Sequence, residues 1–190
     1  LAAVRGAPDA GAWLAEPSVR GLFERTAARH GIAGEHVEGS APLAFAALRA
    51  PLDLGSGADP LPDGVAGADA AMPELRLLYP LPGAPPDGRP PDLVRGVVDL
   101  VFRVGGRTWF LDWKTDRLGA YDPGSLARHV EAHYALQAEL YTLGVVRMLG
   151  VDDEAAHEAR FGGLLYCFLR GMRPDDGRAG VYRARPSWGE

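Results

Sequence analysis

Two apolar runs separated by a glycine pair constrain this sequence more than any other feature. Residues 97–104 and 107–114 flank Gly105-Gly106. Because consecutive glycines readily adopt the positive φ angles of a type I′ turn, the pattern predicts a β-hairpin with a two-residue loop. Such a loop also fixes the register, since the two residues that flank it pair with each other and every further pair follows from them.

This register places apolar pairs on one face of the hairpin. They are Phe102–Trp109, Leu100–Leu111 and Val98–Trp113. We therefore expect this face to be the buried one. On the opposite face Asp99 is predicted to lie directly across from Asp112, and Lys114 follows two residues later on the same side.

Two carboxylates opposed across a strand pair repel each other unless a cation lies between them. Carboxylate oxygens suit a hard divalent ion such as Mg²⁺ or Mn²⁺, and a neighbouring lysine can position a water nucleophile or stabilise charge on a phosphate oxygen. Asp99, Asp112 and Lys114 therefore fit a site that hydrolyses phosphodiesters. The alternatives are that both aspartates are exposed, that the register slips, or that Lys114 merely pairs with an aspartate.

A helical pattern over residues 125–149 follows the hairpin, and Ser125 could cap its start. Gln137 and Tyr141 are one turn apart and so share a face of this helix. They could hold a phosphate backbone or orient metal ligands. Alternatively, they could lie on a flank of the helix, where local hydrogen bonds satisfy the amide and the phenol. An apolar strand over residues 164–169 completes an α/β core with a mixed sheet.

The first part of the chain differs in composition from the rest. An Ala-rich helical pattern precedes residues 51–73, which are rich in Gly, Ala, Asp and Pro and predict a loop or linker. We therefore divide the chain into a helical leader with its linker, residues 1–73, and a core, residues 74–190. A strand over residues 74–79 would open this core, followed by an exposed Pro-rich loop over residues 80–92.

Composition excludes several classes. The net charge of -5 argues against a nucleic-acid binder held by bulk charge, although local phosphate contacts remain open. The single cysteine, Cys167, lies in an apolar run and is expected to be a packed thiol in a reducing, cytoplasmic compartment. There is no P-loop pattern, hence no ATP site, and no run approaches the roughly 18 apolar residues that span a membrane. His129 and His133 have zinc-ligand spacing but no evident third ligand.

The ordered motifs carry a family resemblance. Gly96-x-x-Asp99-Leu100, Asp112-x-Lys114 and Gln137-x-x-x-Tyr141 follow the signature order of the PD-(D/E)xK nucleases. More closely, the sequence resembles the RecB-type group, the C-terminal nuclease domains of exodeoxyribonuclease V β subunits. The segments that resemble this group are residues 96–103, 111–115, 136–143, 161–163 and 166–171.

The resemblance implies a restriction-endonuclease-like fold, preceded here by the helical leader, and Mg²⁺-dependent cleavage of DNA, with Mn²⁺ as a substitute. It implies metal binding by Asp99, Asp112 and the backbone carbonyl of Trp113. Lys114 would be the catalytic lysine, and Gln137 and Tyr141 would support the site. Glu74 matches an acidic residue on the preceding strand of the family, and it is either a further metal ligand or an ordinary exposed glutamate.

One family feature is missing. RecB-type nucleases carry a metal-binding histidine upstream, but neither His30 nor His36 has its sequence context, and we expect that histidine to lie before Leu1. The expected partners are single-stranded DNA, an upstream helicase region of the same polypeptide, RecC- and RecD-type subunits and a RecA-type recombinase. The alternatives are an AddAB-type nuclease, disfavoured because iron–sulfur cysteines are lacking, and a degenerate nuclease fold that serves as a docking module.

Overall fold

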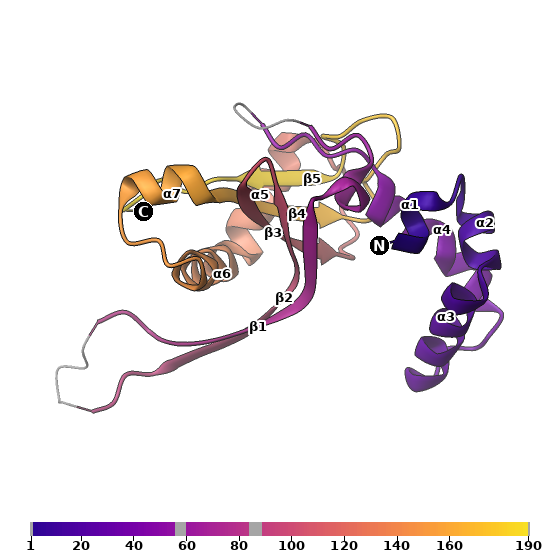
Figure 1. Cartoon of the computed structure of the whole chain (residues 1–190), viewed down its shortest axis with the longest axis horizontal. Coiled ribbons are helices and arrows are strands. Elements are labelled where there is room, and N and C mark those ends of the chain that lie inside the picture. The colour runs from indigo at the N-terminus through magenta and orange to yellow at the C-terminus, as the bar shows by residue number, and fades with distance from the viewer. Residues whose placement is uncertain (1, 56–59, 84–88, 190) are drawn as a thin grey trace.

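A five-stranded mixed sheet forms the centre of the computed structural model, which describes residues 2–55, 60–83 and 89–189 (Figure 1). In spatial order the strands are β1 (Ala70–Pro80), β2 (Leu93–Val104), β3 (Arg107–Lys114), β4 (Phe161–Phe168) and β5 (Val181–Ala184). The β3–β4 pair is parallel and the other neighbouring pairs are antiparallel. This architecture confirms the predicted α/β class and is consistent with a restriction-endonuclease-like core.

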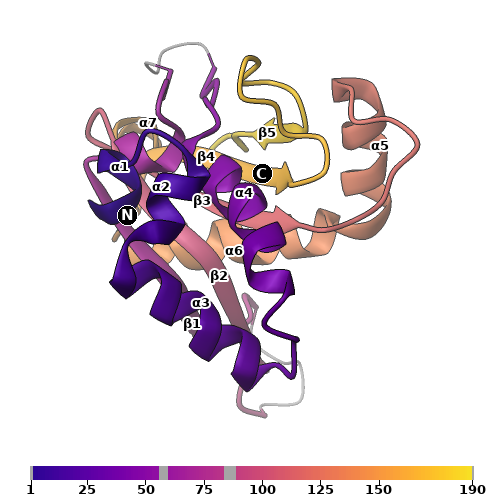
Figure 2. The same ribbon diagram turned by 90° about the vertical axis from the view of Figure 1, so that its right-hand side faces the viewer.

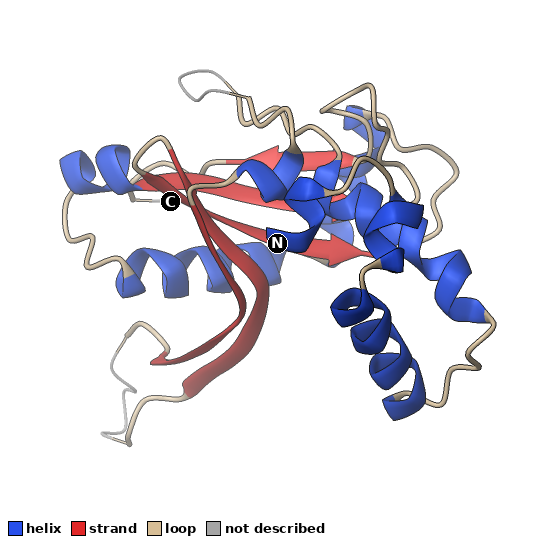
Figure 3. Cartoon of the chain, turned by 45° about the vertical axis from the view of Figure 1, so that its right-hand side comes forward, coloured by secondary structure: helices blue, strands red, loops and turns tan. Residues whose placement is uncertain are grey.

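Helices flank the sheet on both sides (Figure 3). The leader contains α1 (Ala2–Gly6), α2 (Ala10–Ala15), α3 (Pro17–Arg29), α4 (His36–Arg49) and a 3₁₀ turn, η1 (Gly64–Gly67). The connection from β3 to β4 contains α5 (Pro123–His133), α6 (Ala135–Met148) and α7 (Glu154–Arg160). A helical crossover of this kind is what a parallel strand pair requires. No helix in the described part of the chain is long and apolar enough to cross a membrane.

The hairpin between β2 and β3 has the predicted register. Its pairs run from Val104–Arg107 to Leu100–Leu111. Gly105 and Gly106 have φ angles of 57° and 79°, the left-handed values that a type I′ turn needs. The turn chemistry therefore sets the pairing of the two strands that carry the candidate site.

The predicted pairing of Asp99 with Asp112 is wrong, because the ladder ends one pair earlier, at Leu100 and Leu111. At this point the Trp113 N–H donates to the Asp99 carboxylate (Oδ2, 2.8 Å). The two strands separate because β3 continues along β4, with Lys114 opposite Phe168, whereas β2 follows β1. The predicted Val98–Trp113 pair is lost for the same reason.

Both faces of the sheet are covered, so the prediction that the hairpin has a single buried face is wrong. One face packs against the segment that follows α4. We call this cluster the linker-side core, and its buried members are Leu52, Leu54, Leu61, Val65, Ala68, Leu100, Phe102, Trp109, Leu111, Leu165, Cys167 and Val181. The opposite face packs against α5 and α6. We call this second cluster the helix-side core, and it includes Leu77, Val98, Val101, Phe110, Leu126, Val130, Val145, Leu164, Tyr166 and Phe168.

The β1–β2 ladder changes face at Asp99. It keeps one register throughout, except that Glu74 and Asp99 do not pair. On one side of this gap Leu100 belongs to the linker-side core, whereas on the other side the next even-numbered residue, Val98, belongs to the helix-side core. Glu74 has a φ of 53°, a left-handed conformation that a non-glycine residue adopts only with strain. Beyond this irregularity β1 and β2 extend away from the other strands as a long arm (Figure 1).

The segment predicted as a linker contributes to the core. Leu52, Leu61 and Val65 are almost fully buried, at 1%, 4% and 0% exposure. The leader helices pack in turn on η1, through a small cluster that includes Trp13, Val19 and Ala66. The predicted Pro-rich loop falls partly on residues 84–88, outside the described residues, and the division of the chain at residue 73 stays a prediction.

The helix predicted over residues 125–149 is two helices. Tyr134, with φ −130° and ψ 1°, separates α5 from α6, and the two helices run in different directions (Figure 2). Asp122 rather than Ser125 caps α5, because its carboxylate accepts hydrogen bonds from the backbone N–H groups of Gly124 (3.0 Å) and Ser125 (3.1 Å).

Candidate active site

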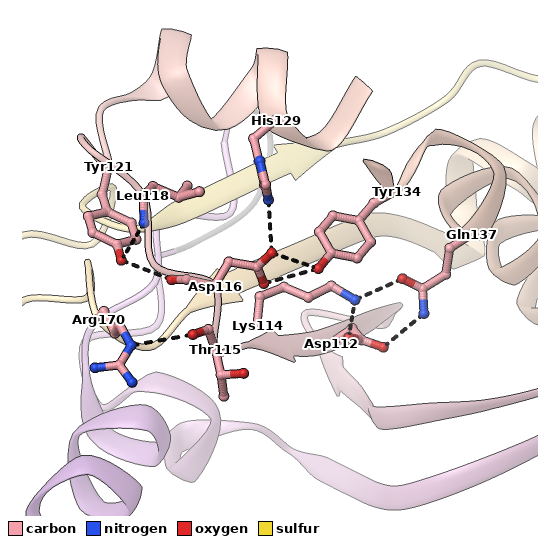
Figure 4. A network of polar contacts seen from close by, with 10 residues as sticks. All are labelled: Asp112, Lys114, Thr115, Asp116, Leu118, Tyr121, His129, Tyr134, Gln137 and Arg170. Carbon is pink, nitrogen blue, oxygen red and sulfur yellow. Dashed lines mark hydrogen bonds and ion pairs between the residues drawn. The ribbon is translucent and has the colours of Figure 1, made fainter. Parts of the chain in front are cut away.

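Three polar side chains contact one another where β3 meets α6 (Figure 4). We call this set the polar arrangement, and its members are Asp112, Lys114 and Gln137. The Lys114 ammonium lies 2.6 Å from Asp112 Oδ2 and donates a hydrogen bond to Gln137 Oε1 (2.8 Å). The Gln137 amide N–H₂ donates to Asp112 Oδ1 across a longer distance of 3.4 Å. Three of the predicted site residues are therefore brought together, and Lys114 does pair with an aspartate as one alternative held.

This arrangement is buried, since Asp112 is 6% and Lys114 7% exposed. Burial raises the pKa of the Asp112 carboxyl, although the hydrogen bond and charge of Lys114 oppose the shift; the nearby charge of Asp99 adds to it. Ionisation of Asp112 is unfavourable in this buried place, and a further positive charge nearby would stabilise its carboxylate form. The electrostatics therefore favour a cation beside Asp112.

Two aromatic rings enclose the Lys114 ammonium. Its Nζ lies 4.0 Å from the ring centroid of Tyr134 and 4.7 Å from that of Tyr166. Cations are attracted to the faces of aromatic rings at such distances. The buried Tyr166 hydroxyl has no hydrogen-bond partner among the described residues, so this residue contributes its ring to the site.

Asp99 lies at the open end of the β2–β3 ladder, half-buried, with its Oδ2 bound to the Trp113 N–H. In a β-strand the N–H and C=O of one residue point to the same edge. The Trp113 carbonyl is therefore directed toward the same edge as Asp99. Asp99 thus lies beside the edge of β3 that carries Trp113, and its charge is near enough to raise the pKa of the Asp112 carboxyl.

Glu74 is exposed and lies at the position across from Asp99 at which the β1–β2 ladder is interrupted. Within the described ranges 2–55, 60–83 and 89–189, no three His, Cys, Asp or Glu side chains are grouped closely enough to hold a metal ion. Glu74 is thus not gathered with both aspartates in this arrangement, and its role as a ligand stays a prediction.

Tyr141 packs on the sheet next to the polar arrangement. Its ring lies edge-on to Phe110, with centroids 6.4 Å apart. A Cβ at Gly96 would lie 2.7 Å from the Tyr141 ring, so only glycine leaves room for the tyrosine here. Gly96 of the motif is therefore a packing partner of Tyr141.

Sequence reasoning missed a second polar network beside Lys114 (Figure 4). Asp116 accepts hydrogen bonds from the Tyr134 hydroxyl (2.9 and 3.0 Å) and contacts His129 Nε2 (2.9 Å). Burial would raise the pKa of Asp116, but these hydrogen bonds outweigh it and the pKa is lowered. One signal was available: Asp116 follows Lys114 by two residues, the spacing that keeps side chains on one side of an extended chain.

Another unused signal is that Lys114 is the only lysine of the chain, whereas all the other residues counted as Lys or Arg are arginines. Arginine is effectively always protonated, whereas lysine is a compact charge on a flexible stem whose proton affinity responds to its surroundings. The single lysine of this chain thus lies in the buried polar arrangement with Asp112 and Gln137.

Two other candidates are resolved by their surroundings. The His129 and His133 rings are 4.5 Å apart, but His129 is engaged by Asp116 and no third ligand joins them in the described structure. Cys167 is fully buried, and burial raises the pKa of its thiol, which confirms the prediction of a packed thiol.

About half of the chain is similar to curated RecB subunits, although no protein-family model matches it. The RecBCD enzyme subunit RecB of Escherichia coli K12 is 40% identical over 103 residues, which cover 51% of this chain and 9% of that subunit. RecB of Haemophilus influenzae is 38% identical over 101 residues, and RecB of Mycolicibacterium smegmatis is 42% identical over 92 residues. In these two the match covers 8% of the subunit, so the chain spans less than a tenth of the length of these relatives. The chain thus contains a RecB-related region.

Proposed function

We propose that this chain is the nuclease module of a RecB-type helicase–nuclease and hydrolyses DNA phosphodiester bonds with Mg²⁺, or Mn²⁺ in its place. The observation that carries the proposal is the buried Asp112–Lys114–Gln137 arrangement beside Asp99, in a chain with a RecB-related region. A carboxylate pair, a lysine and an amide that restrains the lysine are the groups that metal-assisted hydrolysis uses.

The donor set fits a hard divalent cation. Asp99 binds the Trp113 N–H through Oδ2, which leaves its Oδ1 for a metal. Asp112 binds Lys114 through Oδ2, and within the described ranges its Oδ1 has only the long contact with Gln137. With the Trp113 carbonyl these atoms form an all-oxygen set, the kind that Mg²⁺ and Mn²⁺ prefer. When bound, such a cation supplies Lewis acidity and lowers the pKa of a coordinated water.

The residues of the chain then have distinct tasks. Lys114 donates hydrogen bonds to the attacking water or to a phosphate oxygen, where it offsets the negative charge that develops. Gln137 holds the Lys114 ammonium through its carbonyl and Asp112 through its amide group, so that both groups keep one orientation. Tyr141 maintains the position of α6 against Gly96, and Glu74 is a candidate for a further ligand on the arm side of Asp99.

The proposed setting is the one that the family resemblance implies: single-stranded DNA delivered by a helicase region of the same polypeptide, RecC- and RecD-type partner subunits, a RecA-type recombinase and the cytoplasm. No ATP site is proposed within this chain. Delivery of the strand by another part of the complex would make a strongly basic surface unnecessary, in keeping with the net charge of -5.

The test is Mg²⁺-dependent cleavage of single-stranded DNA by the chain and by Asp112→Ala and Lys114→Ala variants. Each substitution is expected to lower the cleavage rate by about 100-fold or more, because it removes a group that stabilises the transition state. Asp152→Ala, at an exposed aspartate, is the matched control and should cleave at the unmodified rate.

Metal binding is measured in parallel by calorimetry with Mg²⁺ and Mn²⁺, and Asp112→Ala should weaken it. Cleavage that survives Asp112→Ala unchanged would show that the activity does not use this site. A chain that neither binds either metal nor cleaves DNA would instead support the docking-module alternative.

A further inference from the structure

The Lys114 ammonium has contacts beyond its two hydrogen-bond partners. Asp112 and Gln137 bind it on one side, and the ring of Tyr134 covers it at 4.0 Å. Tyr134 is the closer of the two enclosing rings, since Tyr166 lies 4.7 Å away. Lys114 is thus held by directional bonds on one side and by an aromatic face on another.

The Tyr134 ring is itself held in place. Its hydroxyl donates to Asp116, at 2.9 Å from Oδ1 and 3.0 Å from Oδ2, and the same carboxylate is fixed by His129 at 2.9 Å. Tyr134 also occupies the non-helical position between α5 and α6, a backbone site that directs its side chain toward the end of β3 (Figure 4).

The contacts run from Lys114 through Tyr134 to Asp116, and the first and last of these residues are only two positions apart in the sequence. Lys114 is the last residue of β3, and Asp116 follows directly after the strand. One strand end therefore carries both the lysine and the carboxylate that fixes the ring covering it. Tyr166 lacks this arrangement, because its buried hydroxyl has no hydrogen-bond partner in the part of the chain that the structure describes.

We propose that Tyr134, oriented by Asp116, is the positioning residue that keeps the Lys114 ammonium directed at Asp112 and Gln137. A lysine side chain has four rotatable bonds, and loss of the ring would let the ammonium sample other directions. The role of this positioning in hydrolysis rests on the proposed function, whereas the positioning itself can be measured without any activity.

Because Lys114 is the only lysine, labelling the protein with ¹³C,¹⁵N-lysine gives NMR signals from this side chain alone. The two rings should shift the Cε methylene protons upfield of the value for an unstructured lysine. Because Tyr134→Leu removes the ring current whether or not the ammonium moves, positioning is read from ¹³C relaxation at Cε. The Cε order parameter should fall in Tyr134→Leu and stay close to that of the unmodified chain in Tyr134→Phe, which keeps the ring. Tyr79→Phe is the control: it loses a tyrosine hydroxyl that donates to the Leu140 carbonyl, away from Lys114, and should leave the signal unchanged.

Steady-state cleavage of single-stranded DNA with Mg²⁺ then separates positioning from binding. Tyr134→Leu should lower kcat by about tenfold or more while KM changes less than about twofold, and Tyr134→Phe should recover most of kcat. If Tyr134→Leu leaves the Lys114 Cε order parameter unchanged, the ring does not position the lysine and the proposal fails.

A second comparison covers the case in which Tyr134→Leu does not fold. Tyr134→Phe and Asp116→Asn both weaken the same hydroxyl–carboxylate contact, so their effects on the Lys114 signal should not add in the double variant. Fully additive effects would overturn the proposal. If the signal responds as expected but the unmodified chain shows no metal-dependent cleavage, the positioning stands and the proposed function fails.

Discussion

Lys114 Nζ and Asp112 Oδ2 lie 2.6 Å apart, and both side chains are almost fully buried. Each charge is therefore the main compensation for the other. A pair of this kind stabilises a fold little relative to an apolar pair, but removing one partner leaves the other charge buried and uncompensated. The pair is better explained by the chemistry of the site than by stability.

The first prediction concerns this pair. Lys114→Met should lower the free energy of unfolding by about 3 kcal/mol at neutral pH, because Asp112 loses its counter-charge inside the protein. The double variant Asp112→Asn with Lys114→Met should recover part of that loss. Urea denaturation of both single variants and the double variant gives the comparison, and a double variant that is less stable than either single variant would contradict it.

The second prediction concerns pH. The net effect of burial and of the hydrogen bonds from His129 and Tyr134 is to lower the pKa of Asp116. Asp116 thus stabilises the fold fully above its ordinary pKa of about 4, and this contribution is lost as the pH falls through the lowered value. Between pH 6 and 3 the urea midpoint of the unmodified chain should fall more steeply than that of Asp116→Asn.

The matched control for this pH series is Asp152→Asn, at an exposed aspartate. Its midpoint should follow that of the unmodified chain across the whole range. Parallel curves for the unmodified chain and Asp116→Asn would mean that the Asp116 network does not contribute to acid stability.

The third prediction tests the glycine under Tyr141. Gly96→Ala introduces a Cβ 2.7 Å from Tyr141 Cε1, so the ring or α6 must move. A loss of about 1–3 kcal/mol is expected, the usual cost of overpacking. Gly119→Ala is the control, since nothing lies within 4 Å of a Cβ at Gly119. Equal denaturation midpoints for the two variants would show that Tyr141 does not depend on this contact.

The fourth prediction concerns the segment between α4 and β1. Leu52 is 1% exposed in the linker-side core, and Leu52→Ala should cost about 2–5 kcal/mol. Leu22 is 56% exposed on α3, and Leu22→Ala should change stability by less than about 0.5 kcal/mol. If Leu52→Ala also has no effect on denaturation, the segment is not part of the folding unit of the sheet.

The features that the sequence predicted well are those set by local rules. The glycine pair determines the hairpin and its register, since the turn and the strands adjoin along the chain. The contact between Asp112 and Lys114 was likewise indicated by a short motif, whose spacing puts both side chains on one side of a strand. Gln137 joined them as expected, although the helix that carries it is shorter than predicted.

The features missed depend on contacts between distant segments. Residues 51–69 have the composition of a loop, yet their few apolar side chains cover one face of the sheet, which no local pattern reveals. The break at Tyr134 interrupts a continuous helical pattern without a glycine or proline, and its hydroxyl binds Asp116, 18 residues earlier. The end of the ladder before Asp99 likewise follows from the different partners of β2 and β3.

Because β2 changes face at Asp99, this sheet can hold the Asp99 carboxylate although both of its faces are covered. Every residue of such a strand normally belongs to one apolar layer or the other, and a charge in either layer is costly. At the crossover Asp99 belongs to neither layer, so it reaches the free backbone edge of the next strand and accepts its N–H. The change of face thereby places a carboxylate of β2 against the end of β3, beside the buried pair of Asp112 and Lys114.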